Sequence, residues 1–200
     1  EQGYALSGLG GIGKTQTALE YAYRFSAEYQ AILWARAETR EILMSDLIAI
    51  AKILGIAGKD EQDQNDIVQA VRQWLTRHTH WLLILDNVTD FACVEEIYPS
   101  VIRGHLLFTT RAQATGLTAQ RIDLKQMDAE DGALFLLRRS KHVALRTSLE
   151  QVTAKEYAAA RAISCTVDGL PLALDQAGAY IEETGCSLSD YLDRYQTSRA

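Results

Sequence analysis

The chain has 200 residues, 48% of them hydrophobic, and a formal net charge of -6 at pH 7, so it can bury a substantial core and offers no basic surface to nucleic acid or an anionic membrane. Its three cysteines are far apart in the sequence, which predicts neither a disulfide framework nor a zinc site and favours a reducing compartment. The longest apolar runs, such as Trp81–Leu85, are too short to span a bilayer. We therefore expect a cytoplasmic protein.

The first elements alternate between strand and helix. The apolar run Tyr4–Ser7 predicts a strand, and Thr15–Phe25 carries apolar side chains at helical spacing. A second strand is expected at Ala31–Ala35, followed by a helix over Glu41–Leu54 that Gly55 ends. One face of that helix is expected to contain Ile42, Leu43, Leu47, Ile50, Ile53 and Leu54.

A polar stretch, Gly58–Asn65, predicts an exposed loop, and an amphipathic helix is expected over Ile67–Leu75. The runs Trp81–Leu85 and His105–Phe108 are almost continuously apolar, as in strands covered on both faces, and Arg121–Leu124 is a candidate fifth strand. Parallel strands need crossovers that cover the sheet. The alternation therefore predicts an α/β fold with a five-stranded parallel sheet flanked by helices.

From Met127 onward the pattern predicts helices alone. Asp128 is the expected N-cap of the first of them. The predicted helices are Ala129–Ser140, Ala154–Val167, Pro171–Thr184 and Leu188–Tyr195. We therefore predict two domains, a P-loop nucleotide-binding domain over residues 1–126 and a small all-helical subdomain over 127–200. The chain starts at Glu1 without a methionine, and we expect flanking domains beyond it.

The segment Gly8-Leu9-Gly10-Gly11-Ile12-Gly13-Lys14-Thr15 fits the pattern G-x-x-x-x-G-K-[ST] between a predicted strand and a predicted helix. Glycines let the backbone curl around phosphates, and the following helix presents the positive end of its dipole. Lys14 is expected to bridge the β- and γ-phosphates, and the Thr15 hydroxyl to coordinate Mg²⁺. The predicted nucleotide-binding residues are Gly8, Gly10, Gly11, Ile12, Gly13, Lys14, Thr15 and Gln16.

A magnesium–nucleotide site of this class needs a carboxylate at the end of a neighbouring buried strand. Asp86 ends the run Leu82–Asp86 and is the predicted metal partner, although a strand-ending aspartate can also merely cap the next turn. The next residue, Asn87, can orient a water but cannot accept its proton. Asp90 can act as the proton acceptor in place of Asn87 only if the following turn brings its carboxylate back toward the phosphate. We therefore expect slow ATP hydrolysis to ADP and phosphate.

Arg111 follows the strand that runs into Thr109-Thr110. It is expected at the carboxyl edge of the sheet, where ligands of open α/β folds bind. This position suits a sensor of the γ-phosphate. An exposed arginine paired with some carboxylate is the alternative.

Several segments resemble the NB-ARC family of STAND signalling ATPases: the loop Gly8–Thr15, Leu82–Asp86, Leu107–Arg111 and the run Gly169-Leu170-Pro171-Leu172-Ala173-Leu174. The resemblance covers nearly the whole chain and implies that Arg111 reports the terminal phosphate. It also implies that Pro171, with Leu172 beside it, packs against the nucleotide base, although Leu170 and Leu172 can equally be core residues. The stretch Ala31–Ala37 is similar to bacterial members, which often carry tetratricopeptide repeats after a winged-helix domain.

The resemblance further implies an inducible switch. ADP holds such proteins closed, and exchange for ATP together with partner binding opens them for assembly, so the expected partners are adenine nucleotide, other domains of the same chain, protein partners and further copies. The family's upstream Gly-Arg-Glu motif and its winged-helix histidine have no counterpart here. The histidines His78, His80, His105 and His142 are therefore expected to be structural or solvated. The alternatives are a conventional turnover ATPase and a scaffold that binds nucleotide without hydrolysis.

Overall fold

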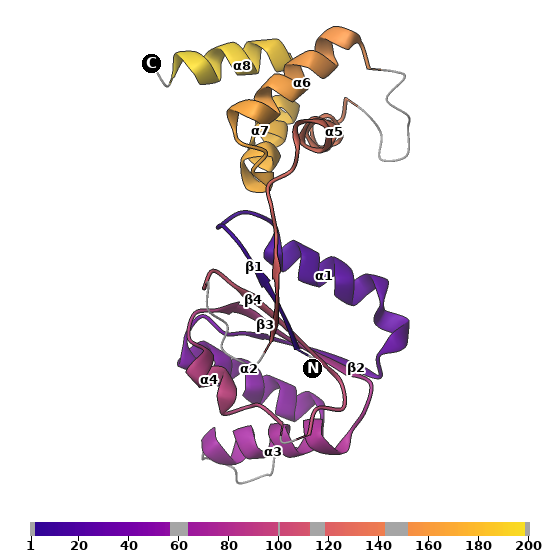
Figure 1. Ribbon diagram of the computed structural model, residues 1–200, viewed down its shortest axis with the longest axis vertical. Coiled ribbons are helices and arrows are strands. Elements are labelled where there is room, and N and C mark those ends of the chain that lie inside the picture. The colour runs from indigo at the N-terminus through magenta and orange to yellow at the C-terminus, as the bar shows by residue number, and fades with distance from the viewer. Residues whose placement is uncertain (1–2, 57–63, 100, 113–118, 143–151, 199–200) are drawn as a thin grey trace. The chain divides into compact units, whose positions relative to one another are not determined.

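The computed structural model describes residues 3–56, 64–99, 101–112, 119–142 and 152–198 (Figure 1). The chain divides into two compact units. The first comprises Glu1–Gly10 and Lys14–Leu124, and the second comprises Gly11–Gly13 and Lys125–Ala200.

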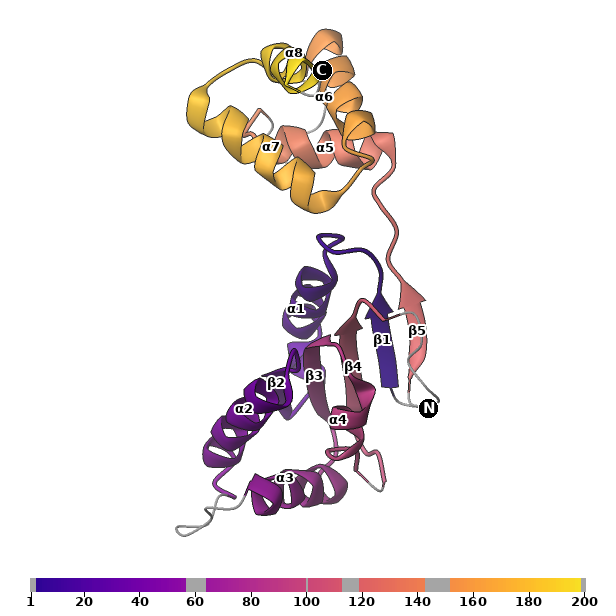
Figure 2. The same ribbon diagram turned by 90° about the vertical axis from the view of Figure 1, so that its left-hand side faces the viewer.

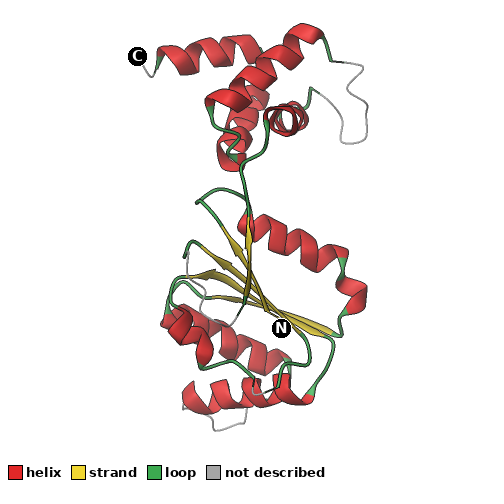
Figure 3. Cartoon of the chain, viewed as in Figure 1, coloured by secondary structure: helices red, strands yellow, loops and turns green. Residues whose placement is uncertain are grey.

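The first unit contains a five-stranded sheet whose paired strands are all parallel (Figure 3). The spatial order is β2-β3-β4-β1-β5. The sheet predicted from the alternating pattern is therefore confirmed, including its fifth strand near Arg121. The strands are β1 (Gly3–Ser7), β2 (Ala31–Arg36), β3 (Trp81–Val88), β4 (His105–Thr110) and β5 (Gln120–Asp123).

Helices cover both faces of this sheet (Figures 1 and 2). Successive side chains of a strand point to opposite faces. On one face, Leu82, Ile84 and Leu107 pack with Ala18 and Ala22 of α1. The larger core on the other face contains buried residues of α2, α3 and α4 together with their sheet partners. The helical segments of this unit are α1 (Lys14–Arg24), the 3₁₀ turn η1 (Ser26–Glu28), α2 (Arg40–Ile53), α3 (Gln64–Arg77) and α4 (Phe91–Glu95).

The apolar face expected for α2 is wrong at Ile53, which is 82% exposed. Met44 and Ala51 are buried instead, in a stripe centred on Leu47. At about 100° per residue, Ile53 lies roughly 120° around the helix from Leu47, so it faces away from the sheet. The pattern also missed η1 and α4, each too short to show a helical period.

The polar loop predicted over Gly58–Asn65 is wrong at its carboxyl end, because α3 begins at Gln64. Residues 57–63, the rest of that prediction, lie outside the described residues. The helix predicted over Ile67–Leu75 begins three residues earlier and ends two residues later than expected, and the other predicted helices begin and end within two residues of their expected bounds.

The second unit consists of helices around a core of its own. The predicted N-cap is confirmed, since the Asp128 carboxylate accepts a hydrogen bond from the Asp131 N–H at 2.8 Å. Capping boxes at Thr153 and Ser187 begin two further helices. No helix within the described ranges is long and apolar enough to cross a bilayer. The helices are α5 (Ala129–Arg139), α6 (Ala154–Thr166), α7 (Pro171–Thr184) and α8 (Leu188–Thr197).

Gly104 lies against the indole that anchors the amino end of β3. A Cβ atom at Gly104 would lie 2.2 Å from Cδ2 of Trp81 and 2.3 Å from its carbonyl oxygen. The fully buried indole cannot move easily, because its Nε1 donates to the Leu75 carbonyl at 2.9 Å. Gly104→Ala is therefore expected to lower the free energy of unfolding by roughly 1–3 kcal/mol. Urea unfolding measures this loss, with Val101→Ala at a 52% exposed neighbour as control; equal stability of the two variants would contradict the expected clash.

Candidate functional site

The loop between β1 and α1 lies at the carboxyl edge of the sheet. Gly11 in this loop has φ 76°, a left-handed conformation that glycine adopts without strain. Within the second unit, the backbone N–H of Leu172 donates to the Gly11 carbonyl at 3.1 Å. A Cβ atom at Gly11 would lie only 2.9 Å from the Leu172 Cβ. Both backbone conformation and space therefore require glycine at this position.

Lys14, at the first position of α1, turns back over the loop. Its Nζ donates to the carbonyl oxygens of Gly8 at 2.9 Å and Leu9 at 2.8 Å, and the side chain is buried. Burial and then the Arg111 guanidinium lower the pKa of Lys14, and the Asp86 carboxylate opposes this shift. The ammonium group therefore lies in a partly desolvated position beside a second cation, where an anion would be stabilised.

Arg111 provides that second cation. A Cβ atom built on Gly10 would lie 3.8 Å from the Arg111 Cζ, so the guanidinium lies beside the glycine loop. It follows β4 directly, at the same edge of the sheet as the loop. The predicted proximity of Arg111 to the loop is thus found, and the paired cations suit a polyphosphate.

The Asp86 carboxylate joins two hydroxyl groups at the ends of neighbouring elements. Its Oδ1 accepts hydrogen bonds from the Thr15 Oγ1 at 2.9 Å and from the Thr109 Oγ1 at 2.6 Å. Thr15 belongs to α1, Asp86 to β3 and Thr109 to β4. Carboxylate and hydroxyl oxygens are ligands that Mg²⁺ accepts. The pair Thr15 and Asp86 therefore fits the metal role expected from the sequence.

Asn87 and Asp90 follow Asp86 on the chain. Asn87 has φ 61°, and its backbone N–H donates to the Thr109 Oγ1 at 2.8 Å. Asp90 is the N-cap of α4, and its Oδ1 accepts from the Ala92 N–H at 2.9 Å. Its carboxylate thus stabilises a helix end, as N-cap carboxylates commonly do.

The remaining predicted site residues differ from one another in burial. Ile12 is buried and Gln16 is exposed. Pro171 occupies the first position of α7, where its missing N–H leaves no helical bond unmade. Leu172 is 49% exposed, so the alternative that it is a core residue is wrong.

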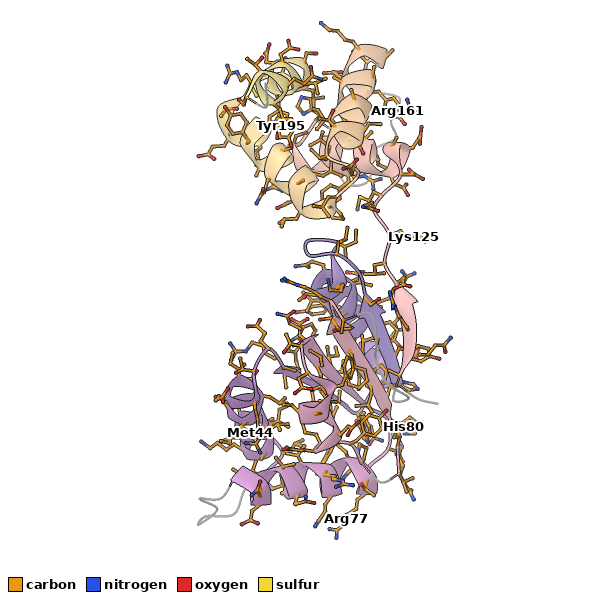
Figure 4. The ribbon with its side chains drawn as sticks, turned by 60° about the vertical axis from the view of Figure 1, so that its left-hand side comes forward. Met44, Arg77, His80, Lys125, Arg161 and Tyr195 are labelled. Carbon is orange, nitrogen blue, oxygen red and sulfur yellow. The ribbon has the colours of Figure 1, made fainter. Side chains whose placement is uncertain are left out.

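The histidines lie elsewhere. His80, labelled in Figure 4, directly precedes β3. His105 begins β4, so both residues are at the amino edge of the sheet, opposite the loop. The Nδ1 of His105 is 2.8 Å from the Tyr29 hydroxyl. His142 lies in the second unit, with its Nδ1 2.9 Å from the Ser140 hydroxyl.

The sequence reading missed a polar group that precedes the loop. Ser7, the last residue of β1, is 1% exposed and donates a hydrogen bond to the Asp123 carboxylate of β5. The Arg121 Nε donates to the Ser7 Oγ at 2.8 Å and to the Asp123 Oδ1 at 2.6 Å. A serine ending an apolar strand was the available signal. These bonds tie the start of the loop to the edge strand.

A family model, described as the NB-ARC domain, matches residues 2–137. The chain is also 27% identical over 219 residues to a nucleotide-binding leucine-rich repeat (NLR)-like protein of Hyaloscypha variabilis. That alignment covers 98% of this chain and 21% of the relative, so the chain spans about a fifth of the relative's length. The predicted bacterial type and tetratricopeptide repeats stay predictions.

Solved structures share the fold. Cdc6p from Pyrobaculum aerophilum superposes with a TM-score of 0.57 at 14% identity, covering 92% of this chain and 56% of that one. The FIGL-1 AAA domain in complex with ADP has a TM-score of 0.55 at 16% identity, covering 99% and 71%. At these identities the likeness concerns the fold. The family match over residues 2–137, together with the loop and the Asp86 cluster, shows that this chain belongs to the NB-ARC family.

Proposed function

We propose that the chain is the adenine-nucleotide-binding switch core of a signal-transduction ATPase, with an ADP-bound resting state, an ATP-bound active state and slow ATP hydrolysis. Residues 1–126 form the nucleotide-binding domain of this proposal, and residues 127–200 the helical subdomain. Family membership supports nucleotide binding. The observation that carries the proposal is the hydrogen bond between the Thr15 hydroxyl and the Asp86 carboxylate, because it brings the loop and the strand end to one point.

Thr15 and Asp86 are the residues that would hold Mg²⁺. Both supply oxygen atoms, and their 2.9 Å separation places the two ligand groups together. When bound with nucleotide, the ion neutralises charge on the phosphates. Lys14 binds the phosphates by replacing its two bonds to loop carbonyls with bonds to phosphate oxygens.

Arg111 supports the switch part of the proposal. Its guanidinium lies beside Gly10 and lowers the pKa of Lys14. Two neighbouring cations repel each other, and each additional phosphate charge relieves that repulsion. A terminal phosphate that only ATP carries therefore makes a contact that distinguishes ATP from ADP, and such a difference is what shifts a two-state equilibrium.

Slow hydrolysis follows from the residues after Asp86. Asn87 can hydrogen-bond a water but cannot take its proton. Asp90 is the next carboxylate after Asp86 along the chain, and it caps α4. The general-base contribution of roughly 10²- to 10⁴-fold is therefore largely absent, and a bound nucleotide defines a lasting state.

The proposal includes a cytoplasmic location and, in the active state, contacts with other domains of the same chain, protein partners and further copies of it. The role of Pro171 and Leu172 at the nucleotide base rests on the family motif alone. A turnover ATPase and a non-hydrolysing scaffold are the competing functions. Steady-state ATP turnover separates them, since it is rapid for the first, absent for the second and slow for a switch.

Lys14→Ala and Thr15→Ala are each expected to weaken binding of magnesium–ADP, because both side chains serve the phosphate end of the ligand. A lost bond to a charged group costs roughly 1.5–3 kcal/mol, or about 10- to 100-fold in affinity. The fold should persist, since the Lys14 ammonium bonds to carbonyls of its own loop. Calorimetry and thermal unfolding test both points, with Lys52→Ala, an exposed lysine of α2, as control. Parent-like affinity in folded Lys14→Ala protein would refute the nucleotide site.

Arg111→Ala is expected to weaken ATP binding by at least about 10-fold more than ADP binding, because the γ-phosphate loses a charge-assisted hydrogen bond. Competition titrations of both nucleotides measure the ratio. Arg103→Ala is the matched control: Arg103 is exposed and precedes β4, whereas Arg111 follows it. Equal losses for ATP and ADP would make Arg111 a general electrostatic residue and not a sensor.

The parent chain is expected to turn ATP over far below the enzymatic median of about 10 per second. Asn87→Asp should raise the single-turnover rate, because it adds a proton acceptor at a position whose φ of 61° aspartate also tolerates. Asp90→Ala should leave the rate unchanged and destabilise α4. Turnover near the median in the parent, abolished by Asp90→Ala alone, would overturn both the slow switch and the role of Asn87.

A further inference from the structure

The pairing of β3 with β4 contains a bulge at the site itself. Leu85 pairs with Phe108 and Val88 pairs with Thr110. Asp86 and Asn87 therefore lie together opposite Thr109 alone. Such bulges are rare between parallel strands and re-aim side chains beside functional sites.

Thr109 serves both residues of the bulge with one hydroxyl group. Its Oγ1 accepts from the Asn87 backbone N–H at 2.8 Å and lies 2.6 Å from the Asp86 Oδ1. A hydroxyl has a single proton. Because the Asn87 N–H is itself a donor, that proton is directed to the carboxylate. Thr109 is 1% exposed, so water does not compete for these bonds.

The adjacent threonine makes a different set of bonds. Thr110 is also fully buried, and its Oγ1 donates to the Val88 carbonyl at 2.6 Å and accepts from the Ala112 N–H at 2.9 Å. Both of these partners are backbone groups. Thr110 therefore stabilises the strand end without contacting the Asp86 carboxylate.

We propose that Thr109 is a positioning residue for the cation site: its hydroxyl holds the Asp86 carboxylate against the Thr15 hydroxyl before any cation binds. This inference rests on the proposed magnesium–nucleotide function. Outer partners of this kind orient metal-ligating carboxylates, and their loss typically costs 10- to 100-fold in metal affinity. The bulge makes this possible, because it places both Asp86 and Asn87 within hydrogen-bond distance of the buried Thr109 hydroxyl.

The test is a Mg²⁺ titration of the protein–ADP complex, paired with ADP binding in excess chelator. Thr109→Val, which removes the hydroxyl, is expected to weaken Mg²⁺ affinity roughly 10- to 100-fold and to leave chelator-measured ADP affinity unchanged. Thr109→Ser restores the parent value, because it retains the donor. Thr110→Val is the control for loss of a buried hydroxyl: it lowers stability in urea and retains parent Mg²⁺ affinity.

Thr109→Cys keeps the test decisive if the valine variant does not fold, because a thiol is a weaker hydrogen-bond donor and acceptor. It should weaken Mg²⁺ affinity relative to Thr109→Ser. Parent-like Mg²⁺ affinity in Thr109→Val or Thr109→Cys, or an equal loss in Thr110→Val, would overturn the positioning role. A parent chain that binds ADP equally with and without Mg²⁺ would also overturn the Thr109 role, because no cation site would then exist. A parent chain that binds no ADP under either condition would instead overturn the proposed function.

Discussion

A carboxylate at the end of a buried strand is the constraint on which the rest of this site depends. The residues of β3 before Asp86 are almost fully buried between helices on both faces of the sheet. Asp86 itself is partly buried, and hydrogen bonds stabilise a carboxylate that is taken partly out of water. Asp86 receives them from Thr15 and Thr109. The same bonds tie the first turn of α1 to the centre of the sheet, so the glycine loop that precedes α1 is held at its carboxyl end.

The loop is held at its other end by a separate polar group. Ser7 is hydrogen-bonded to Asp123 and Arg121 of the edge strand β5. The glycine loop lies between these two anchors, and the Lys14 ammonium donates hydrogen bonds to two of its carbonyl oxygens. The two ends of the loop are therefore held in place by bonds within the first unit, which limits the ordering that a bound phosphate must bring about.

The local charge of the site differs in sign from that of the whole chain. The formal net charge is -6, yet burial and then the nearby Arg111 guanidinium lower the pKa of Lys14. A helix N-terminus adds partial positive charge at the same place. In the proposed function, phosphate would be recognised by these two side chains and the oriented backbone, so that an acidic chain could bind a strongly acidic ligand.

In the second unit, the motif Gly-Leu-Pro-Leu-Ala has a packing reason of its own. Gly169 has φ 60°, and a Cβ atom there would lie 2.0 Å from the Met127 carbonyl oxygen. The Met127 N–H also donates to the Gly169 carbonyl at 3.0 Å. Gly169 therefore allows the backbone before α5 to pack closely against the backbone before α7, and Pro171 then begins α7.

Local pattern alone determined the parallel sheet, the glycine loop, the capped helix after Asp128 and the strand-ending Asp86, because each depends on neighbours in the chain. The tertiary structure decided the rest. Thr109 meets Asp86 only through the register of β3 against β4, and the bulge between Leu85 and Val88 changes that register by one residue. A one-residue change reverses which side chains face each other across a strand pair, and residue spacing along the chain does not encode it. In the same way Ser7 was found as a partner of Asp123 only once β1 and β5 were placed beside one another.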